Sequence, residues 1–237
     1  MFALAVCHAD TNRIRGYFYD EGYLRTSSKD FNVEKWDNRL IHLTNDAVQK
    51  YSADYGKYES ANKISYLDFD KHLQREKGIS FLQTIVPKIK EIVTDVFEAN
   101  GRLMYRPKQC SEGVSRGENA INYNAFELMG FDFMLDADLN LYLIEVNTNP
   151  CLDTPCMLLQ RMIPQVLDQT LKLAVDPFLN ASEHQYYMTQ DMTISEMRFQ
   201  LVYQDSMELA RQSQRGELKE QQPEQVQDSP RQKQAKE

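Results

Sequence analysis

One stretch of the chain is decisive for the fold: Gly130-Phe131-Asp132-Phe133-Met134-Leu135-Asp136-Ala137-Asp138-Leu139-Asn140-Leu141-Tyr142-Leu143-Ile144-Glu145-Val146-Asn147. It predicts a β-hairpin, because apolar residues flank a polar connection, residues 136–140, that is rich in turn formers. With the centre of the hairpin placed between Asp138 and Leu139, Asp132 lies opposite Glu145, and opposed residues are about 5 Å apart. Asn147 shares the strand face of Glu145, because side chains alternate along a strand.

These three polar side chains predict a metal site. Two facing carboxylates repel each other, and a buried ionised carboxylate is costly, so a cation is expected between Asp132 and Glu145. Carboxylate and amide oxygens suit Mg²⁺, which makes Asn147 the third expected ligand. The alternative is a set of ordinary polar residues on a solvated strand face. The otherwise apolar strands weigh against that alternative.

Composition limits the class of protein. The chain has 237 residues, 42% hydrophobic and 26% charged, which is ordinary for a globular protein of one or two domains. No apolar run approaches the roughly 20 residues that span a membrane, so no membrane partner is expected. The net charge of −8 argues against a nucleic-acid surface. The four cysteines lack zinc spacing and are expected to be reduced thiols of a cytosolic protein.

The pattern along the chain predicts an α+β fold, with an antiparallel sheet flanked by helices. Residues 2–9 and 14–20 form a second expected hairpin, and residues 27–65 a loop-rich cover. Helices are expected over residues 67–75, 81–97, 154–175 and 194–209, with Pro87 and Pro164 inside two of them. The expected organisation is a catalytic part over residues 1–180, a helical extension over 181–211 and a disordered tail rich in Gln, Glu and Lys over 212–237.

Four runs together resemble the tubulin–tyrosine ligase family. Three of them are Tyr19-Asp20-Glu21-Gly22-Tyr23-Leu24-Arg25-Thr26, His42-Leu43-Thr44-Asn45, and Tyr55-Gly56-Lys57-Tyr58-Glu59 followed by Asn62. The fourth is the hairpin with its continuation, Leu143-Ile144-Glu145-Val146-Asn147-Thr148-Asn149-Pro150. Each run alone is weak, but four in this order are specific. The resemblance covers roughly residues 1 to 179.

The resemblance implies an ATP-grasp-like fold and a ligase. Family members use ATP to activate a carboxylate as an acyl phosphate, which an amine attacks to give an amide, and so add tyrosine, glutamate or glycine to tubulin or other proteins. By position, Asp132, Glu145 and Asn147 are similar to the Mg²⁺ ligands, and Glu145 is also catalytic. Arg25 is similar to a catalytic arginine that grips the substrate carboxylate or acyl phosphate. The remaining assignments are Thr44 and Asn45 as nucleotide contacts and Lys50 as an amino-acid contact.

Each assigned residue has a structural alternative. Arg25 taken alone would be a surface arginine after a strand. Thr44 and Asn45 would be a helix N-cap or turn residues. Lys50 would be a solvated residue on a helix face. The role assigned to Arg25 is also supported by its chemistry, because an arginine presents a planar fork to a carboxylate or phosphate.

The chain departs from the family pattern at its start. The adenine-binding strands, the phosphate-binding lysine and a Lys-Phe-Asp-Ile-Arg-like segment precede this region in the family, so the chain is expected to be the C-terminal half of a catalytic domain. The first hypothesis is an ATP- and Mg²⁺-dependent ligase, with glutamate slightly favoured over tyrosine and glycine as the added residue. The alternative is a catalytically incomplete remnant that binds tubulin or microtubules. An unrelated ATP-grasp enzyme that joins small metabolites is a third reading.

The expected partners are a free amino acid and the acidic C-terminal tails of tubulin, or microtubules. The implied place is the cytoplasm, associated with the cytoskeleton or cilium. Because the chain is itself acidic, an acidic tail requires a locally basic face. The residues expected to form that face are Arg13, Arg15, Arg25 and Lys29, with Lys50 near the amino-acid site.

Overall fold

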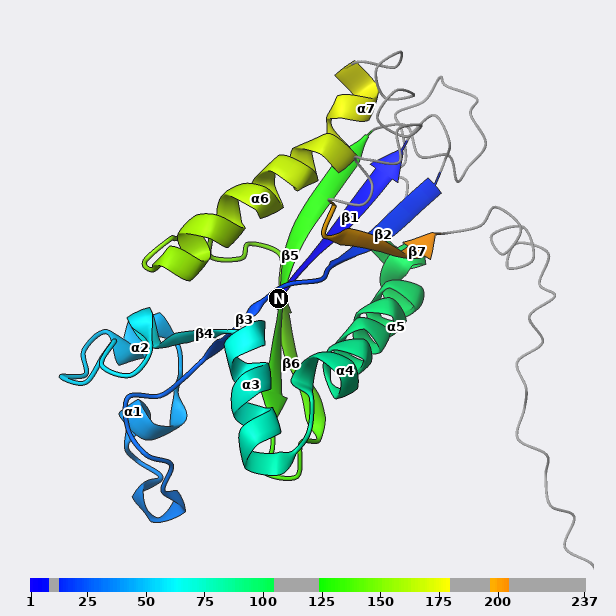
Figure 1. Ribbon diagram of the computed structural model, residues 1–237. Coiled ribbons are helices and arrows are strands. Elements are labelled where there is room, and N and C mark those ends of the chain that lie inside the picture. Colours follow the sequence, from blue (N-terminus) through cyan, green and yellow to red (C-terminus); the bar gives the residue numbers. More distant parts are fainter. Residues whose placement is uncertain (9–12, 105–123, 180–196, 205–237) are drawn as a thin grey trace, which may run out of the picture. The chain divides into compact units, whose positions relative to one another are not determined.

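The computed structural model describes residues 1–8, 13–104, 124–179 and 197–204 (Figure 1). The strands are β1 (Phe2–His8), β2 (Arg13–Tyr19), β3 (Tyr23–Arg25), β4 (Lys63–Ser65), β5 (Ala125–Leu135), β6 (Leu141–Asn147) and β7 (Phe199–Gln204). The α-helices are α1 (Arg39–His42), α2 (Asp46–Gln49), α3 (Tyr66–Lys77), α4 (Phe81–Thr84), α5 (Val86–Met104), α6 (Met157–Ala174) and α7 (Asp176–Leu179). Two 3₁₀ turns, η1 (Val33–Lys35) and η2 (Ser60–Asn62), complete the described elements. The expected α+β class is confirmed.

Five strands form the main sheet, in the order β6-β5-β1-β2-β7. Every neighbouring pair is antiparallel. The expected antiparallel sheet is therefore confirmed, and so is the hairpin expected over residues 2–9 and 14–20, which β1 and β2 form. The central strand β1 is buried along residues 2–7, which explains why it is apolar without alternation. β3 and β4 form a separate two-stranded sheet.

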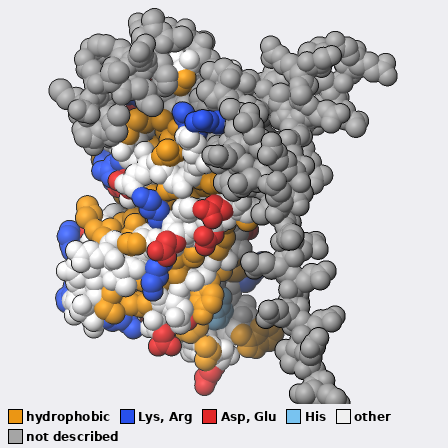
Figure 2. All heavy atoms as spheres, turned by 90° about the vertical axis from the view of Figure 1, so that its right-hand side faces the viewer, with side chains coloured by type: hydrophobic (Ala, Val, Ile, Leu, Met, Phe, Trp, Pro, Cys, Tyr) orange, Lys and Arg blue, Asp and Glu red, His pale blue; other side chains and the backbone are white. Residues whose placement is uncertain are grey.

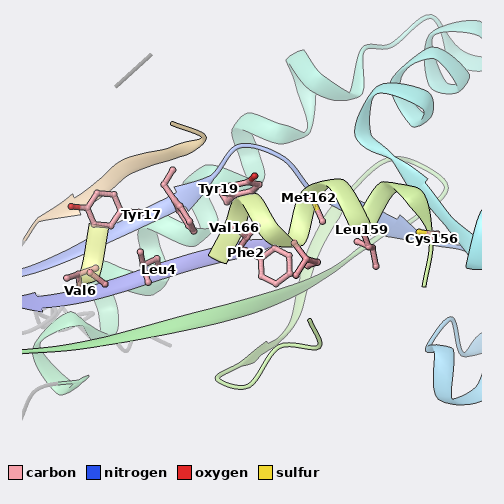
Figure 3. Close-up of a cluster of buried hydrophobic side chains, with 12 residues drawn as sticks. Phe2, Leu4, Val6, Tyr17, Tyr19, Cys156, Leu159, Met162 and Val166 are labelled. Atoms are coloured by element: carbon pink, nitrogen blue, oxygen red, sulfur yellow. The ribbon is translucent and has the colours of Figure 1, made fainter. Parts of the chain in front are cut away.

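The two faces of the main sheet carry separate hydrophobic cores. On one face α6 packs on β1, β2 and β7, and Met162 and Val166 of α6 belong to one buried cluster with side chains of β1 and β2 (Figure 3). On the other face α3, α4 and α5 cover the sheet (Figure 1). Burying each aliphatic or aromatic side chain contributes about 1.5–3 kcal/mol, so these two layers stabilise the sheet.

Close helix packing explains one glycine of β2. A Cβ on Gly16 would lie 2.7 Å from the ring of Phe97 on α5. Since ordinary carbon contacts are longer, a side chain at this position would push α5 away from the sheet.

The helices over residues 67–75, 81–97 and 154–175 are confirmed with shifted ends. α3 begins after Ser65, whose hydroxyl accepts from the N–H of Asp68, and ends at Gly78 in the left-handed region. The stripe over residues 81–97 is divided into α4 and α5, and Pro87 lies in the first turn of α5, where proline is tolerated. Pro164 lies inside α6.

The expected helix over residues 194–209 is wrong at its described residues, because Phe199–Gln204 form β7. β7 pairs with the free edge of β2, and Phe199 is buried in the core under α6. Strand pairing together with this burial overrides the local helical pattern. The rest of the expected extension and the tail over residues 212–237 lie outside the described residues.

None of the helices in the described part of the chain combines the length and the apolar character needed to cross a membrane.

Candidate active site

The hairpin of β5 and β6 carries the expected metal ligands. Asp132 is paired with Glu145, as predicted. The predicted centre between Asp138 and Leu139 holds for this pair and the two beyond it, but the three pairs nearest the turn are centred on Asp138. Ile144 is then an extra residue, a β-bulge, and it shifts the register by one before Glu145.

The turn explains why its centre moved. The carboxylate of Asp136 accepts from the N–H groups of Asp138 at 3.0 Å and Asn140 at 2.8 Å. Hydrogen bonds, first among them from the Asn140 side chain, hold the pKa of Asp136 below its usual value. Leu139 adopts φ 64° to close the loop. This tight five-residue turn sets the first pairs, and the bulge then corrects the register.

The bulge determines which way Glu145 faces. In a regular ladder Glu145 would lie opposite Phe131, which is buried in the core under α3–α5. With the bulge it lies opposite Asp132, on the other face of the sheet. The extra residue, Ile144, is 60% exposed and costs the core nothing.

Asn147 joins the same face. It is paired with Gly130, two residues from Asp132 along β5. Its amide nitrogen donates to Oε1 of Glu145 at 3.2 Å. The structure therefore brings Asp132, Glu145 and Asn147 together on one strand face, while their roles as metal ligands stay predictions.

Arg25 reaches this face from the small sheet. Its Nη2 lies 3.0 Å from Oδ2 of Asp132, and the two side chains are 30% and 29% exposed. The two residues are 107 positions apart in the sequence. The sequence analysis assigned both residues to the site but predicted no contact between them, so this ion pair is a new element of the site.

Tyr23 lies beside this ion pair. Burial raises the pKa of Tyr23 to about 12. The charge of Arg25 opposes this rise, while Cys151, Asp132 and Asp46 add to it. The phenol of Tyr23 is therefore protonated at neutral pH and remains a hydrogen-bond donor at the edge of the site.

The donor set fits a magnesium ion shared with a substrate. Within the described residues, no group of three or more His, Cys, Asp or Glu side chains is placed to hold a metal. Asp132 and Glu145 supply two carboxylates, and Asn147 supplies an amide oxygen. Mg²⁺ commonly takes one or two carboxylates and completes its shell with phosphate oxygens and water. The guanidinium of Arg25 already lies against Asp132, so this face attracts positive charge.

Thr44 and Asn45 precede α2. Asn45 occupies the N-cap position of α2, but its side chain makes no capping hydrogen bond. Its backbone carbonyl accepts from Val48 and Gln49 instead. Asn45 is exposed and Thr44 half-buried. Their side chains are thus placed at the surface, as nucleotide contacts require, although the structure does not join them to Asp132.

Lys50 is exposed at the end of α2. Its Nζ lies over the ring of Tyr51, 5.3 Å from the centroid. Among the described residues no ion pair reaches Lys50, so the structure does not bring it to the Arg25–Asp132 pair. Its assignment as an amino-acid contact stays a prediction.

Comparison with known proteins places these residues in a family. Residues 5–183 match the profile of the tubulin-tyrosine ligase family, a range that includes every candidate residue. The chain belongs to the tubulin-tyrosine ligase family. The resemblance inferred from the four sequence runs is therefore confirmed.

Members of the family are about 30% identical to this chain over the part that aligns. Tubulin glycylase 3B of Tetrahymena thermophila is 30% identical over 163 residues, 68% of this chain and 13% of that protein. Protein monoglycylase TTLL8 of Homo sapiens is 31% identical over 172 residues, 70% of this chain and 18% of that protein. Probable tubulin polyglutamylase TTLL9 of Rattus norvegicus is 29% identical over 139 residues, 59% of this chain and 27% of that protein. The chain thus spans less than a third of the length of these relatives.

The sequence analysis did not identify Lys63 as a candidate residue of the site. Its side chain is 2% exposed, and Nζ donates to Oδ2 of Asp46 at 2.5 Å. In the ladder of β3 and β4 it is the direct partner of Arg25. The run Lys63-Ile64-Ser65 is too short to show a strand pattern, so only knowledge of the β3–β4 pairing could have revealed it.

Two of the basic residues expected to face an acidic tail have separate partners. Arg15 donates to the side chain of Gln204 at 3.3 Å, and Lys29 lies 2.5 Å from Asp54. On the face seen in Figure 2, acidic and basic side chains are interspersed. A docking surface for an acidic tail therefore stays a prediction.

Proposed function

We propose that this chain forms the metal- and carboxylate-binding part of an ATP- and Mg²⁺-dependent ligase that adds an amino acid to tubulin or to another protein. The observation that carries the proposal is the cluster of Asp132, Glu145 and Asn147 on one face of the β5–β6 hairpin, with Arg25 of β3 paired to Asp132. Family membership supports the ligase class. The cluster is what such a ligase requires.

The residues of the cluster have complementary tasks in this proposal. When bound, MgATP supplies the phosphoryl group that turns a carboxylate into an acyl phosphate, whose carbon bonds to an amine nitrogen as inorganic phosphate and a proton leave. Asp132 and Glu145 hold positive charge against the phosphates, which is most of what phosphoryl transfer asks of a protein. Asn147 orients Glu145 through its amide donor.

Arg25 is the residue proposed to bind the substrate carboxylate or acyl phosphate. In the structure Asp132 holds its guanidinium. Were Asp132 to hold Mg²⁺ instead, Arg25 would be free to bind the carboxylate or the acyl phosphate of a substrate. Thr44 and Asn45 are proposed to contact the nucleotide, and Lys50 to contact the amino acid.

The proposed acceptor is tubulin, in the cytoplasm and associated with the cytoskeleton or cilium, because the relatives are named as tubulin glycylases and a probable tubulin polyglutamylase. Those names leave both glycine and glutamate as the added residue.

Incorporation of labelled amino acids tests the proposal. The full-length protein would be incubated with tubulin, MgATP and isotopically labelled glycine, glutamate or tyrosine, and the tubulin tails would be analysed by mass spectrometry. We expect incorporation of one amino acid that stops when ATP or Mg²⁺ is withheld. Microtubule co-sedimentation without any incorporation would contradict the ligase and support the non-catalytic remnant.

A further inference from the structure

Two cationic side chains lie next to each other in the small sheet of β3 and β4. Arg25 is the direct partner of Lys63, and opposed residues on antiparallel strands place their Cβ atoms about 4.5–5.5 Å apart on one face. Like charges so placed repel, and each is held by its own carboxylate. Arg25 lies 3.0 Å from Asp132, and Lys63 lies 2.5 Å from Asp46. The partner of each cation therefore decides whether it is available to an anionic substrate.

The two ion pairs differ in what can release them. Asp132 is a proposed metal ligand, so metal binding competes with Arg25 for its carboxylate. Asp46 is not a proposed metal ligand, and in the described part of the chain it accepts from Lys63 with one oxygen and from the hydroxyl of Tyr55, at 3.3 Å, with the other. The side chain of Lys63 is only 2% exposed. Because a buried ammonium without a partner is costly, Lys63 stays on Asp46.

The space beside Lys63 offers no further free cation. A pocket of about 480 Å³ lies between β4 and α6, and the cationic side chains that line it are Lys63 and Arg161. Arg161 donates to both carboxylate oxygens of the buried Glu21. Glu59 and Asp68 add negative charge to the same lining. A carboxylate that entered this pocket would meet cations already neutralised.

The consequence for substrate choice rests on the proposed function, in which the amine of a free amino acid attacks an activated carboxylate. The amino acid then keeps its own α-carboxylate, which Arg25 is placed to bind once a metal holds Asp132. Glutamate would bring a second carboxylate close to Asp46. We propose that Asp46, by neutralising Lys63, restricts the site to an amino acid with an uncharged side chain, such as glycine.

The test compares glycine with glutamate in the full-length protein. Both labelled amino acids are supplied at equal concentration with MgATP and tubulin, and the incorporation ratio is measured for the wild type and for Asp46→Asn. The wild type is expected to favour glycine by at least about tenfold, the effect of ~1.4 kcal/mol. Asp46→Asn is expected to lower that ratio about tenfold through a gain in glutamate incorporation, because the positive charge of the buried Lys63 is then no longer neutralised and attracts the second carboxylate.

Two further variants separate a specificity role from a structural one. Asp54→Asn removes another lysine-paired carboxylate from the same segment and should leave the ratio unchanged. Asp46→Asn combined with Lys63→Met removes the unneutralised positive charge, so the gain in glutamate incorporation should disappear. General damage to the fold would lower incorporation of both amino acids together and would not reverse in the double variant.

Each outcome bears on a separate claim. Equal use of glycine and glutamate by the wild type would overturn the role of Asp46 while leaving the ligase intact. A folded Asp46→Asn variant with an unchanged ratio would overturn it as well, and if that variant fails to fold, the wild-type ratio alone decides. Absence of incorporation of every amino acid would overturn the proposed function and this inference with it.

Discussion

At the scale of single residues, the site depends on Asp132 having two partners. The carboxylate contacts Arg25 from β3 and faces Glu145 from β6. The sequence predicted the second relation, because alternation in an apolar strand marks which polar residues share a face. It could not predict the first, because 107 residues separate Arg25 from Asp132. Lys63 escaped notice for a related reason, since its significance arises only from its place opposite Arg25.

The metal role of Asp132 gives the first prediction. Asp132→Asn should weaken Mn²⁺ binding in the presence of nucleotide by at least about tenfold, because one ligand charge is lost. Electron paramagnetic resonance of free Mn²⁺ measures the affinity. Asp138→Asn, on the turn of the same hairpin, is the matched control and should bind as the wild type does. Equal affinity for the two variants would show that Asp132 is not a ligand.

At the scale of elements, the β5–β6 hairpin shows what a sequence pattern leaves undetermined. The existence of the hairpin and the pairing of Asp132 with Glu145 were predictable from apolar runs flanking a turn. The position of the turn was not, because Asp136 ties the loop through local hydrogen bonds. The bulge at Ile144 compensates for it, and no residue in the run marks it. The strand β7 was missed in the same way, since its pairing with β2 is a tertiary effect.

Deletions within β6 test the bulge. Removing Ile144 should be tolerated, because it leaves Glu145 opposite Asp132 and takes away only an exposed residue. Removing Val146 should abolish Mn²⁺ binding, because it turns Asn147 to the opposite face. Thermal melting by circular dichroism would accompany each binding measurement. A folded Ile144 deletion that binds no metal would contradict the register described here.

At the scale of the whole molecule, the buried carboxylate of Glu21 links the sheet to α6. Glu21, at the end of β2, accepts from Arg161 on α6 and lies 3.3 Å from Arg198 beside β7. Glu21 lies between β2 and β3, so these ion pairs anchor the segment that leads into β3 and Arg25. The fold class was predictable from the sequence because long apolar runs dominate it. The ion pairs of Glu21 were not, since their members are scattered along the chain.

Alkaline pH should destabilise this arrangement. Burial raises the pKa of Tyr19 and of Tyr23 from about 10 to about 12, and burial also raises that of Tyr66. The folded state therefore favours the neutral phenols. That stabilisation is complete below pH 10 and is lost as the pH rises towards 12. Phenolate absorbance and circular dichroism should change together in this window. Full ionisation of these tyrosines with the fold intact would contradict their burial.

The most direct measurement of the central claim is the ligation rate of Glu145→Gln in the full-length protein. The substitution is nearly isosteric and removes one ligand charge from the face shared with Asp132. Glu127→Gln, an exposed carboxylate on β5, is the matched control. We predict that Glu145→Gln lowers MgATP-dependent incorporation about 100-fold or more with an unchanged melting temperature, while Glu127→Gln retains wild-type activity. Wild-type turnover in Glu145→Gln would contradict the claim that this strand face is the active site of a ligase.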